Sequence, residues 1–402
     1  MPSVFIKTYG CQMNERDSEA VAAQLVAKGY SMTADALTAD VILLNTCSVR
    51  DAAEQKALGK MSHVAGQLRS KNRKAVLGFM GCMAQSRGRE LIDKLPDVDL
   101  VVGTQKFHRT ADHIGDLLAG RAEGVVDTGE EKGSEATIRE HLLNGASDKK
   151  SVTSFVSIMQ GCNQFCTFCI VPDTRGRERS RSIDDIVSEC RELVNRGVRE
   201  VTLLGQIVTS YGRREIGERD GKSAFVQLIE AVHGIDGLDR IRFTSPHPKG
   251  YGDDLIEAYG RLAKLCESAH IPVQSGSDAM LKRMHRGYTR ERFLEIVGKL
   301  RAVRPGIGVT TDIIVGFPGE TEEEFEATMS LCREVQFDNA FVFKYSTRRD
   351  TPAAAMENQL PRELIEQRHA MVLAAIDEMG ARRYEKFVGK TMEVLVEGPS
   401  RR

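Results

Sequence analysis

The sequence predicts an α/β fold in two parts, a doubly wound parallel domain followed by a partial, TIM-like (β/α)6 barrel. Short apolar runs rich in β-branched residues alternate with helix-like stretches along most of the 402 residues, and this alternation is typical of parallel sheets. A polar stretch with scattered glycines divides the alternation into two blocks. Hydrophobic residues make up 41% and charged residues 28%, which is usual for a globular protein.

The first block, residues 1–126, contains strand-like runs at residues 4–10, 41–46, 75–81 and 98–103. Helix-like stretches lie between them, for example at residues 17–28 and 52–70. We expect this block to form one parallel α/β domain and residues 127–150 to form a linker or a surface excursion.

The second block, residues 151–386, has six strand-like runs separated by helical stretches, which predicts a barrel with two βα units fewer than the full eight. Thr321 is the expected N-cap of one helix and Glu324 its capping-box partner, and Pro361 opens a long amphipathic helix. The last residues, 387–402, resemble the first strand of a small β domain. The six runs are residues 152–158, 200–204, 240–244, 270–273, 309–315 and 340–345.

The net charge of −1 gives no sign of a polyanion partner, so any RNA binding must come from local patches. No apolar run reaches about 18 residues, which argues against a membrane-spanning helix, and the N-terminus is polar too soon for a signal peptide. We therefore expect a cytoplasmic protein, in which the nine cysteines do not form a disulfide framework.

Three cysteines, Cys162, Cys166 and Cys169, form a C-x3-C-x2-C motif after the first strand of the second block. Three thiolates can hold three corners of an iron–sulfur cube, which leaves one iron open for the amino and carboxylate groups of S-adenosylmethionine (SAM). A closed zinc site is the alternative, but it requires four ligands, and residues 151–180 contain neither a histidine nor a fourth cysteine.

A second trio, Cys11, Cys47 and Cys82, recurs at nearly equal intervals, each cysteine directly after a predicted strand. The carboxyl ends of neighbouring parallel strands share one edge of a sheet, where ligands normally bind. We therefore expect this trio to converge on a second cluster, with three unrelated core cysteines as the alternative. The other cysteines, Cys190, Cys266 and Cys332, lie in apolar helical patterns and are interpreted as core residues.

Motifs across nearly the whole chain resemble those of the radical-SAM methylthiotransferases, and most closely those of the members that act on N6-isopentenyladenosine in tRNA. The chain departs from the usual family pattern at Asp173, where tyrosine is common, and at Ile207 and Thr209, where asparagine is common. The motifs include KTYGCQMNERDSE, NTCSVRDAAE, GCMAQ, GCNQFCTFCIVP, TRGRERSR, SPHPK, HIPVQSGSDAMLKRMHRGYTRE, TDIIVGFPGETEEEF and FKYSTRRDTPAA.

The resemblance implies two [4Fe–4S] clusters, one on each cysteine trio, and SAM as cosubstrate. It further implies a transferase that removes a hydrogen atom from adenine C2 beside the anticodon, inserts sulfur and methylates it from SAM. The expected partners are the tRNA anticodon loop and a flavodoxin- or ferredoxin-type electron donor, with no membrane. Residues 387–402 then correspond to the start of a truncated RNA-binding β-barrel of the TRAM type.

Loops at the strand ends are expected to bind SAM, since strand ends form the catalytic face of a barrel. A basic run, Arg175, Arg177, Arg179 and Arg181, is a candidate for phosphate contacts, with a solvated charged surface as the alternative. The expected SAM-binding residues are Gly205, Gln206, Gln274, Ser275, Gly316, Pro318 and Gly319.

Three other functions remain open at this point. One is a methylthiotransferase for a ribosomal protein side chain or for threonylcarbamoyl-adenosine in tRNA. Another is a non-enzymatic iron–sulfur electron carrier, which would consume no SAM. The last is a zinc-stabilised binding module, which metal analysis would reveal.

Overall fold

The chain folds into two units whose residues interleave along the sequence. The computed structural model describes residues 1–48, 51–129, 131 and 151–399. Unit 1 comprises residues 1–150 together with Gln160–Cys162 and Ile170–Arg181, and unit 2 contains the remainder. Most of the expected linker at residues 127–150 lies outside the described residues.

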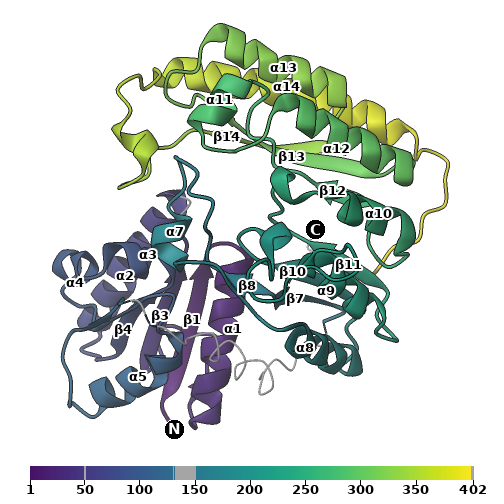
Figure 1. The fold of residues 1–402 in the computed structure, drawn as a ribbon. Helices are drawn as coiled ribbons and strands as arrows, with labels where there is room; N and C mark the ends of the chain where they lie inside the picture. The colour runs from purple at the N-terminus through teal and green to yellow at the C-terminus, as the bar shows by residue number, and fades with distance from the viewer. Residues whose placement is uncertain (49–50, 130, 132–150, 400–402) are drawn as a thin grey trace. The chain divides into compact units, whose positions relative to one another are not determined.

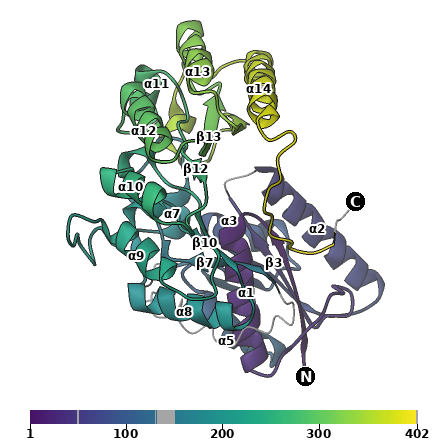
Figure 2. The same ribbon diagram turned by 90° about the vertical axis from the view of Figure 1, so that its right-hand side faces the viewer.

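Unit 1 is a doubly wound sheet of six parallel strands in the order β2-β1-β3-β4-β5-β6, which confirms the expected fold class. Helices α1 and α5 pack on one face of the sheet, and α2, α3 and α4 pack on the other; Figure 2 shows α1 and α2 on opposite sides of β3. The strands are β1 (Ser3–Tyr9), β2 (Ser31–Met32), β3 (Val41–Thr46), β4 (Val76–Met80), β5 (Leu100–Val102) and β6 (Val125–Asp127), and the helices are α1 (Gln12–Ala27), α2 (Asp51–Ser70), α3 (Cys82–Arg87), α4 (Glu90–Lys94) and α5 (Thr110–Leu118).

The strand order of unit 1 reverses between β1 and β3. Strand β1 pairs in parallel with β2 on one side and with β3 on the other. All six residues of β3 are buried, as expected for a strand covered on both faces. In doubly wound sheets such a reversal opens a crevice at the carboxyl ends of the strands, where ligands bind.

Unit 2 contains the six expected barrel strands in two parallel sheets, β11-β10-β7 and β12-β13-β14. A single parallel bridge between Ile241 and Leu265 links β11 to the segment before β12, and one hydrophobic core includes residues of both sheets. Figure 1 shows α13 and α14 on one side of β13 and β14. The strands are β7 (Thr153–Ser157), β10 (Glu200–Leu204), β11 (Arg240–Phe243), β12 (Ser268–His270), β13 (Gly308–Val315) and β14 (Asn339–Lys344), and the main helices are α8 (Ile183–Asn195), α9 (Ala224–His233), α10 (Asp253–Arg261), α11 (Asp278–Arg283), α12 (Arg290–Val303), α13 (Glu322–Val335) and α14 (Arg362–Glu385).

Local signals in the sequence set several of the helix ends. The Thr321 side chain accepts a hydrogen bond from the backbone N–H of Glu324, and the Glu324 carboxylate accepts one from the backbone N–H of Thr321, which confirms the capping box. Pro361 is the N-cap of α14. The strand expected near the C-terminus is not found within the described residues 386–399. None of the described helices is both long and apolar enough to cross a bilayer.

Candidate functional site

The second cysteine trio lies at the carboxyl ends of three adjacent strands of unit 1. Cys11 follows β1 and caps α1, Cys47 directly follows β3, and Cys82 begins α3 just after β4. The backbone N–H of Cys47 donates to the carbonyl oxygen of Tyr9 at 2.9 Å, which aligns the ends of β1 and β3. Sequence reasoning expected this shared edge, and the sheet order places it beside the reversal between β1 and β3.

Two asparagines that sequence reasoning missed connect the residues of this trio. The Asn14 amide oxygen lies 3.4 Å from the Cys11 sulfur, and the Asn14 Nδ2 lies 4.0 Å from the Cys82 sulfur. The same Nδ2 donates to Asn45 Oδ1 at 3.0 Å, and Asn45 Nδ2 donates to the Asn14 carbonyl oxygen at 2.8 Å. Both asparagines are fully buried. Their signal was their position beside cysteines in GCQMN and NTC.

The thiols of this trio have different acidities. A hydrogen bond from Cys47 lowers the pKa of Cys11 to about 5, with a smaller contribution from the Arg175 charge and against the opposing effect of burial. Burial raises the pKa of Cys82 despite the nearby Arg175. At neutral pH, Cys11 is therefore a thiolate, which is the form that binds iron.

Arg175 belongs to this site, which corrects its expected role as an RNA contact. Its Nη2 donates to Asp17 Oδ2 at 2.7 Å, and both side chains are buried, with exposed fractions of 3% and 5%. Its positive charge also acts to lower the pKa values of Cys11 and Cys82. Burial alone would lower the pKa of Arg175. The negative charges of Asp17 and the thiolates outweigh this effect, so the pKa of Arg175 lies well above its ordinary value.

The other arginines of the basic run differ in exposure. Arg181 is also buried, at 7% exposed, so it does not fit the expected phosphate contact. Arg177 is exposed and Arg179 is half-buried. Of the four candidates, Arg177 and Arg179 thus remain available as predicted RNA contacts.

The backbone just before the C-x3-C-x2-C loop, at Gly161 and Cys162, is in close contact with the backbone after the loop, at Gly176 and Arg177. The backbone N–H of Cys162 donates to the Gly176 carbonyl oxygen at 3.0 Å. Gly161 has φ +80°, and a Cβ atom there would lie 2.0 Å from the Arg177 carbonyl oxygen. Only glycine allows both this backbone conformation and this close approach.

Within unit 2, the rest of the cysteine loop contacts the end of α11, the residues after it and the loop after β13. Thr167 Oγ1 donates to the Arg283 carbonyl oxygen at 2.9 Å, and the Phe168 ring packs edge-on against Phe317 at 6.5 Å between centroids. Arg286 Nη1 donates to the Cys166 sulfur at 3.3 Å. Sequence reasoning quoted Arg286 in a motif but did not assign it to the site.

His247, from the SPHPK motif, lies beside Arg286 and is neutral. Burial, followed by the Arg286 charge, lowers the pKa of His247 to about 2, and its ring packs edge-on against Tyr288. Its Nδ1 accepts from the Lys249 backbone N–H, so Nε2 carries the hydrogen. Thr209, one of the departures from the family pattern, accepts a hydrogen bond from the His247 backbone N–H at 3.0 Å.

Gln206 is the expected SAM-binding residue that the structure supports best. It follows β10, and its Oε1 is buried without a hydrogen-bond partner among the described residues. A buried unpaired acceptor is costly, and the ammonium group of a bound amino acid would satisfy it. The residues at this strand end therefore fit the methionine part of SAM.

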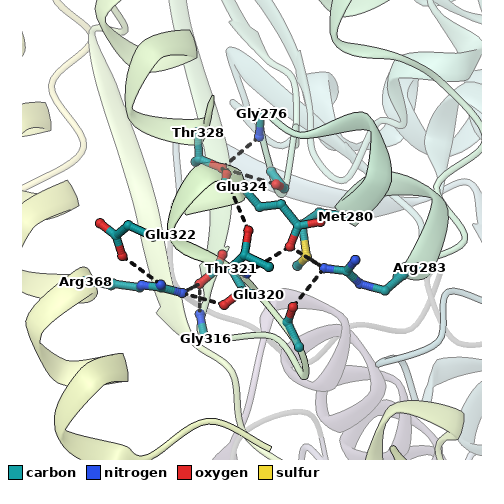
Figure 3. Close-up of polar contacts among 12 residues, drawn as sticks. Gly276, Met280, Arg283, Gly316, Glu320, Thr321, Glu322, Glu324, Thr328 and Arg368 are labelled. Atoms are coloured by element: carbon teal, nitrogen blue, oxygen red, sulfur yellow. Dashed lines mark hydrogen bonds and ion pairs between the residues drawn. The ribbon is translucent and has the colours of Figure 1, made fainter. Parts of the chain in front are cut away.

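Other expected SAM contacts already make hydrogen bonds within the protein, and Figure 3 shows the contact of Gly316 with Glu320. The Ser275 hydroxyl is fully buried and hydrogen-bonds Thr328 Oγ1 at 3.1 Å. The Gly316 N–H donates to Glu320 Oε2 at 2.8 Å, and a Cβ atom on Gly316 would lie 2.5 Å from Ile365 on α14. Ser275 and Gly316 therefore help to hold the strand ends in place, and their contacts with SAM stay a prediction.

The same network secures the loop between β13 and α13 (Figure 3). Arg368 Nη1 donates to Glu320 Oε2 at 2.8 Å, and its Nη2 donates to Glu322 at 2.9 Å. Arg283 donates to the Gly319 carbonyl oxygen at 3.2 Å and also to Glu324 Oε2. Pro318 is buried within this loop. Gln274 stays a predicted contact, at 7% exposed and with φ +69°.

Within the described residues, no group of three His, Cys, Asp or Glu side chains has the arrangement that a single metal ion requires. A cubane cluster binds each thiolate to a different iron, so its ligands lie further apart than those of one ion. Cys190 and Cys332 are core residues as expected, whereas Cys266 is half-buried and lines a cavity of about 210 Å³ in unit 2.

Comparison with known proteins adds independent information. The Radical SAM superfamily model matches residues 156–332, and the model of uncharacterized protein family UPF0004 matches residues 3–103. The tRNA-2-methylthio-N(6)-dimethylallyladenosine synthase of Opitutus terrae is 55% identical, with 100% of this chain and 88% of the relative covered. The protein of the same name from Akkermansia muciniphila is 52% identical, with 100% and 89% covered.

The fold also resembles solved structures. A radical S-adenosylmethionine methyltransferase, TsrM from Kitasatospora setae, aligns with a TM-score of 0.67 at 13% identity, covering 88% of this chain and 77% of TsrM. At that identity the likeness concerns the fold alone, and it agrees with the barrel described for unit 2.

Proposed function

Because this chain belongs to the family of tRNA-2-methylthio-N(6)-dimethylallyladenosine synthases within the radical SAM superfamily, we propose that it acts through two cysteine trios, each holding a [4Fe–4S] cluster. The enzyme converts N6-dimethylallyladenosine beside the anticodon of tRNA into its 2-methylthio derivative. A hydrogen atom leaves adenine C2, sulfur takes its place, and SAM methylates the sulfur. The observation that carries the proposal is the placement of Cys11, Cys47 and Cys82 at three adjacent strand ends.

In this proposal each trio has a separate task. Cys162, Cys166 and Cys169 hold the cluster that binds SAM, and Cys11, Cys47 and Cys82 hold the second cluster. When bound, the two clusters supply the one-electron cleavage of SAM and the sulfur for insertion. A cluster with three protein ligands keeps one iron open for a further ligand.

Residues of the chain support these tasks by binding and orientation. Gln206 Oε1 accepts a hydrogen bond from the ammonium group of SAM, which satisfies an atom that has no partner in the described part of the chain. Asn14 and Asn45 hold the loops that carry Cys11 and Cys82 at fixed positions through their paired amides. These contacts limit the motion of the thiolates, as outer contacts commonly do at metal sites.

The partners follow from the same reaction. Arg177 and Arg179 are the candidates for contact with tRNA phosphates, and the anticodon loop suits the reaction because an unpaired base can leave the stack at low cost. The electron comes from a reduced flavodoxin- or ferredoxin-type protein. We infer that the enzyme works in the cytoplasm, together with its tRNA substrate.

The test is anaerobic reconstitution of the full chain with iron and sulfide, followed by reaction with SAM, reductant and dimethylallyl-modified tRNA. We expect about eight irons per chain and 2-methylthio nucleoside detected by mass spectrometry. Cys82→Ala is expected to reduce the iron content to about four and to abolish sulfur insertion, whereas Cys332→Ala, a matched change in the core, keeps about eight irons. SAM cleavage without any 2-methylthio nucleoside would contradict the proposed substrate.

A further inference from the structure

Arg286 places a permanent positive charge against one of the expected cluster ligands. Its Nη1 lies 3.3 Å from the Cys166 sulfur, and its Nη2 donates to the Pro272 carbonyl oxygen at 3.2 Å. Its Nε donates to the Tyr288 hydroxyl oxygen, also at 3.2 Å. The side chain is buried, at 6% exposed, so solvent screens this charge only weakly.

No carboxylate within the described part of the chain pairs with Arg286. Its contacts among the described residues are a thiol, a phenol and a backbone carbonyl. The Tyr288 hydroxyl donates in turn to the Val273 carbonyl oxygen at 2.7 Å, and burial raises the pKa of Tyr288, so it stays neutral. A guanidinium group is not deprotonated in proteins, and the site therefore keeps one full positive charge.

The other trio has an arginine as well, but that arginine is neutralised. Arg175 acts on Cys11 and Cys82, and its guanidinium group is paired with the buried carboxylate of Asp17 at 2.7 Å. The local charge contributed by this pair is close to zero. Among the described residues, Arg286 thus lacks the carboxylate partner that Arg175 has in Asp17.

We propose that Arg286 raises the reduction potential of the cluster held by Cys162, Cys166 and Cys169, so that the incoming electron resides there in preference to the second cluster. The inference rests on the proposed function of these cysteines. Reduction transfers one electron from the flavodoxin- or ferredoxin-type donor to the cluster; the donor is oxidised by one electron, and no bond or proton is exchanged. A positive charge and a hydrogen bond at the sulfur stabilise the more negative, reduced cluster, which raises its potential.

The experiment is a potentiometric titration of the full-length, anaerobically reconstituted protein, followed by electron paramagnetic resonance. The signal that changes when SAM is added identifies the SAM-binding cluster. For Arg286→Met we expect the reduced-to-oxidised ratio of that cluster to fall about tenfold at a fixed potential, which corresponds to about 59 mV for a one-electron couple. The signal of the second cluster is expected to keep its potential.

Two matched variants separate charge from packing. Arg286→Lys keeps the charge, and Arg290→Met makes the same substitution at an arginine that pairs with Glu334 and does not contact Cys166. Both are expected to stay within about twofold of the wild-type ratio. Arg286→Gln, which keeps hydrogen-bonding capacity without charge, is expected to shift in the same direction as Arg286→Met and serves if the methionine variant is unstable.

An unchanged potential in the neutral variants would overturn the inference. So would an equal fall in Arg286→Lys and Arg286→Met, because that result would assign the effect to packing. Loss of iron from both neutral variants would make Arg286 a structural support and would also overturn the inference. Failure of the proposed function is a separate result: the wild-type protein itself would then show no SAM-sensitive signal.

Discussion

At the scale of single residues, Asp17 and Arg175 form an ion pair buried inside unit 1. Replacing Asp17 by Asn leaves the guanidinium group buried without its counter-charge. We expect Asp17→Asn to lower the free energy of unfolding by about 3–5 kcal/mol, measured by urea denaturation. The exposed pair of Glu378 and Arg382 is the control, because Glu378→Gln is expected to cost under about 0.5 kcal/mol.

The acidity of Cys11 gives a prediction that depends on pH. Since its pKa is lowered to about 5, the reactive thiolate is already present at neutral pH, and the fraction falls only as the pH drops through about 5. In iron-free protein we expect iodoacetamide to label Cys11 faster than Cys332 at pH 6.5, as read by peptide mass spectrometry. Burial raises the pKa of Cys332 to about 12, and its labelling should stay negligible. Equal labelling of the two would contradict the site's electrostatics.

Sequence patterns could predict that Cys11, Cys47 and Cys82 follow neighbouring strands, which the structure confirms, but they could not assign the neighbouring arginines. The run from Arg175 to Arg181 has the spacing of a surface basic patch, yet Arg175 is turned inward to a carboxylate more than a hundred residues earlier in the chain. Charge composition carries no information on such a distant partner. The same reason hid Asn14 and Asn45, whose role depends on two strands being neighbours.

At the scale of secondary structure elements, the N-terminus of α13 is stabilised by a buried ion pair and by a helix cap, which differ in strength. Glu320 is buried with Arg368, whereas Thr321 only caps the helix. We expect Glu320→Gln to cost about 3 kcal/mol of unfolding free energy and Thr321→Ala about 1 kcal/mol, measured by thermal or urea denaturation of both variants. Equal losses would contradict the burial argument.

The strands themselves were predictable because parallel, buried strands appear as continuous apolar runs. The sequence pattern did not predict β2, whose residues are exposed, or β6 (Val125–Asp127), whose residues are only half-buried. It also set the strand at residues 270–273 too late, since β12 is Ser268–His270. These errors concern short strands, in which pairing with a neighbour outweighs local pattern.

At the scale of the whole molecule, the two units share the chain in an interleaved order that no composition shift revealed. Residues 160–162 and 170–181 follow the expected domain boundary in sequence but belong to unit 1. We therefore expect residues 1–150 and residues 151–402, co-expressed as separate chains with a tag on one, to purify together. Asp17→Asn in the first chain should reduce the recovered partner. Elution of residues 1–150 alone would contradict this assignment.

The close backbone contact at Gly161 also constrains the length of the cysteine loop. Gly161 packs against the backbone of Arg177, and the Cys162 N–H donates a hydrogen bond to the Gly176 carbonyl oxygen. The residues between them therefore form a loop whose two ends are held together by non-covalent contacts. A loop with fixed ends needs a minimum number of residues to connect them. Shortening the stretch that carries the cysteines would strain these closing contacts, whereas added loop length is absorbed at a small cost in loop entropy. Deletions between Cys162 and Gly176 are therefore expected to open this contact, whereas insertions in other loops are expected to leave it intact.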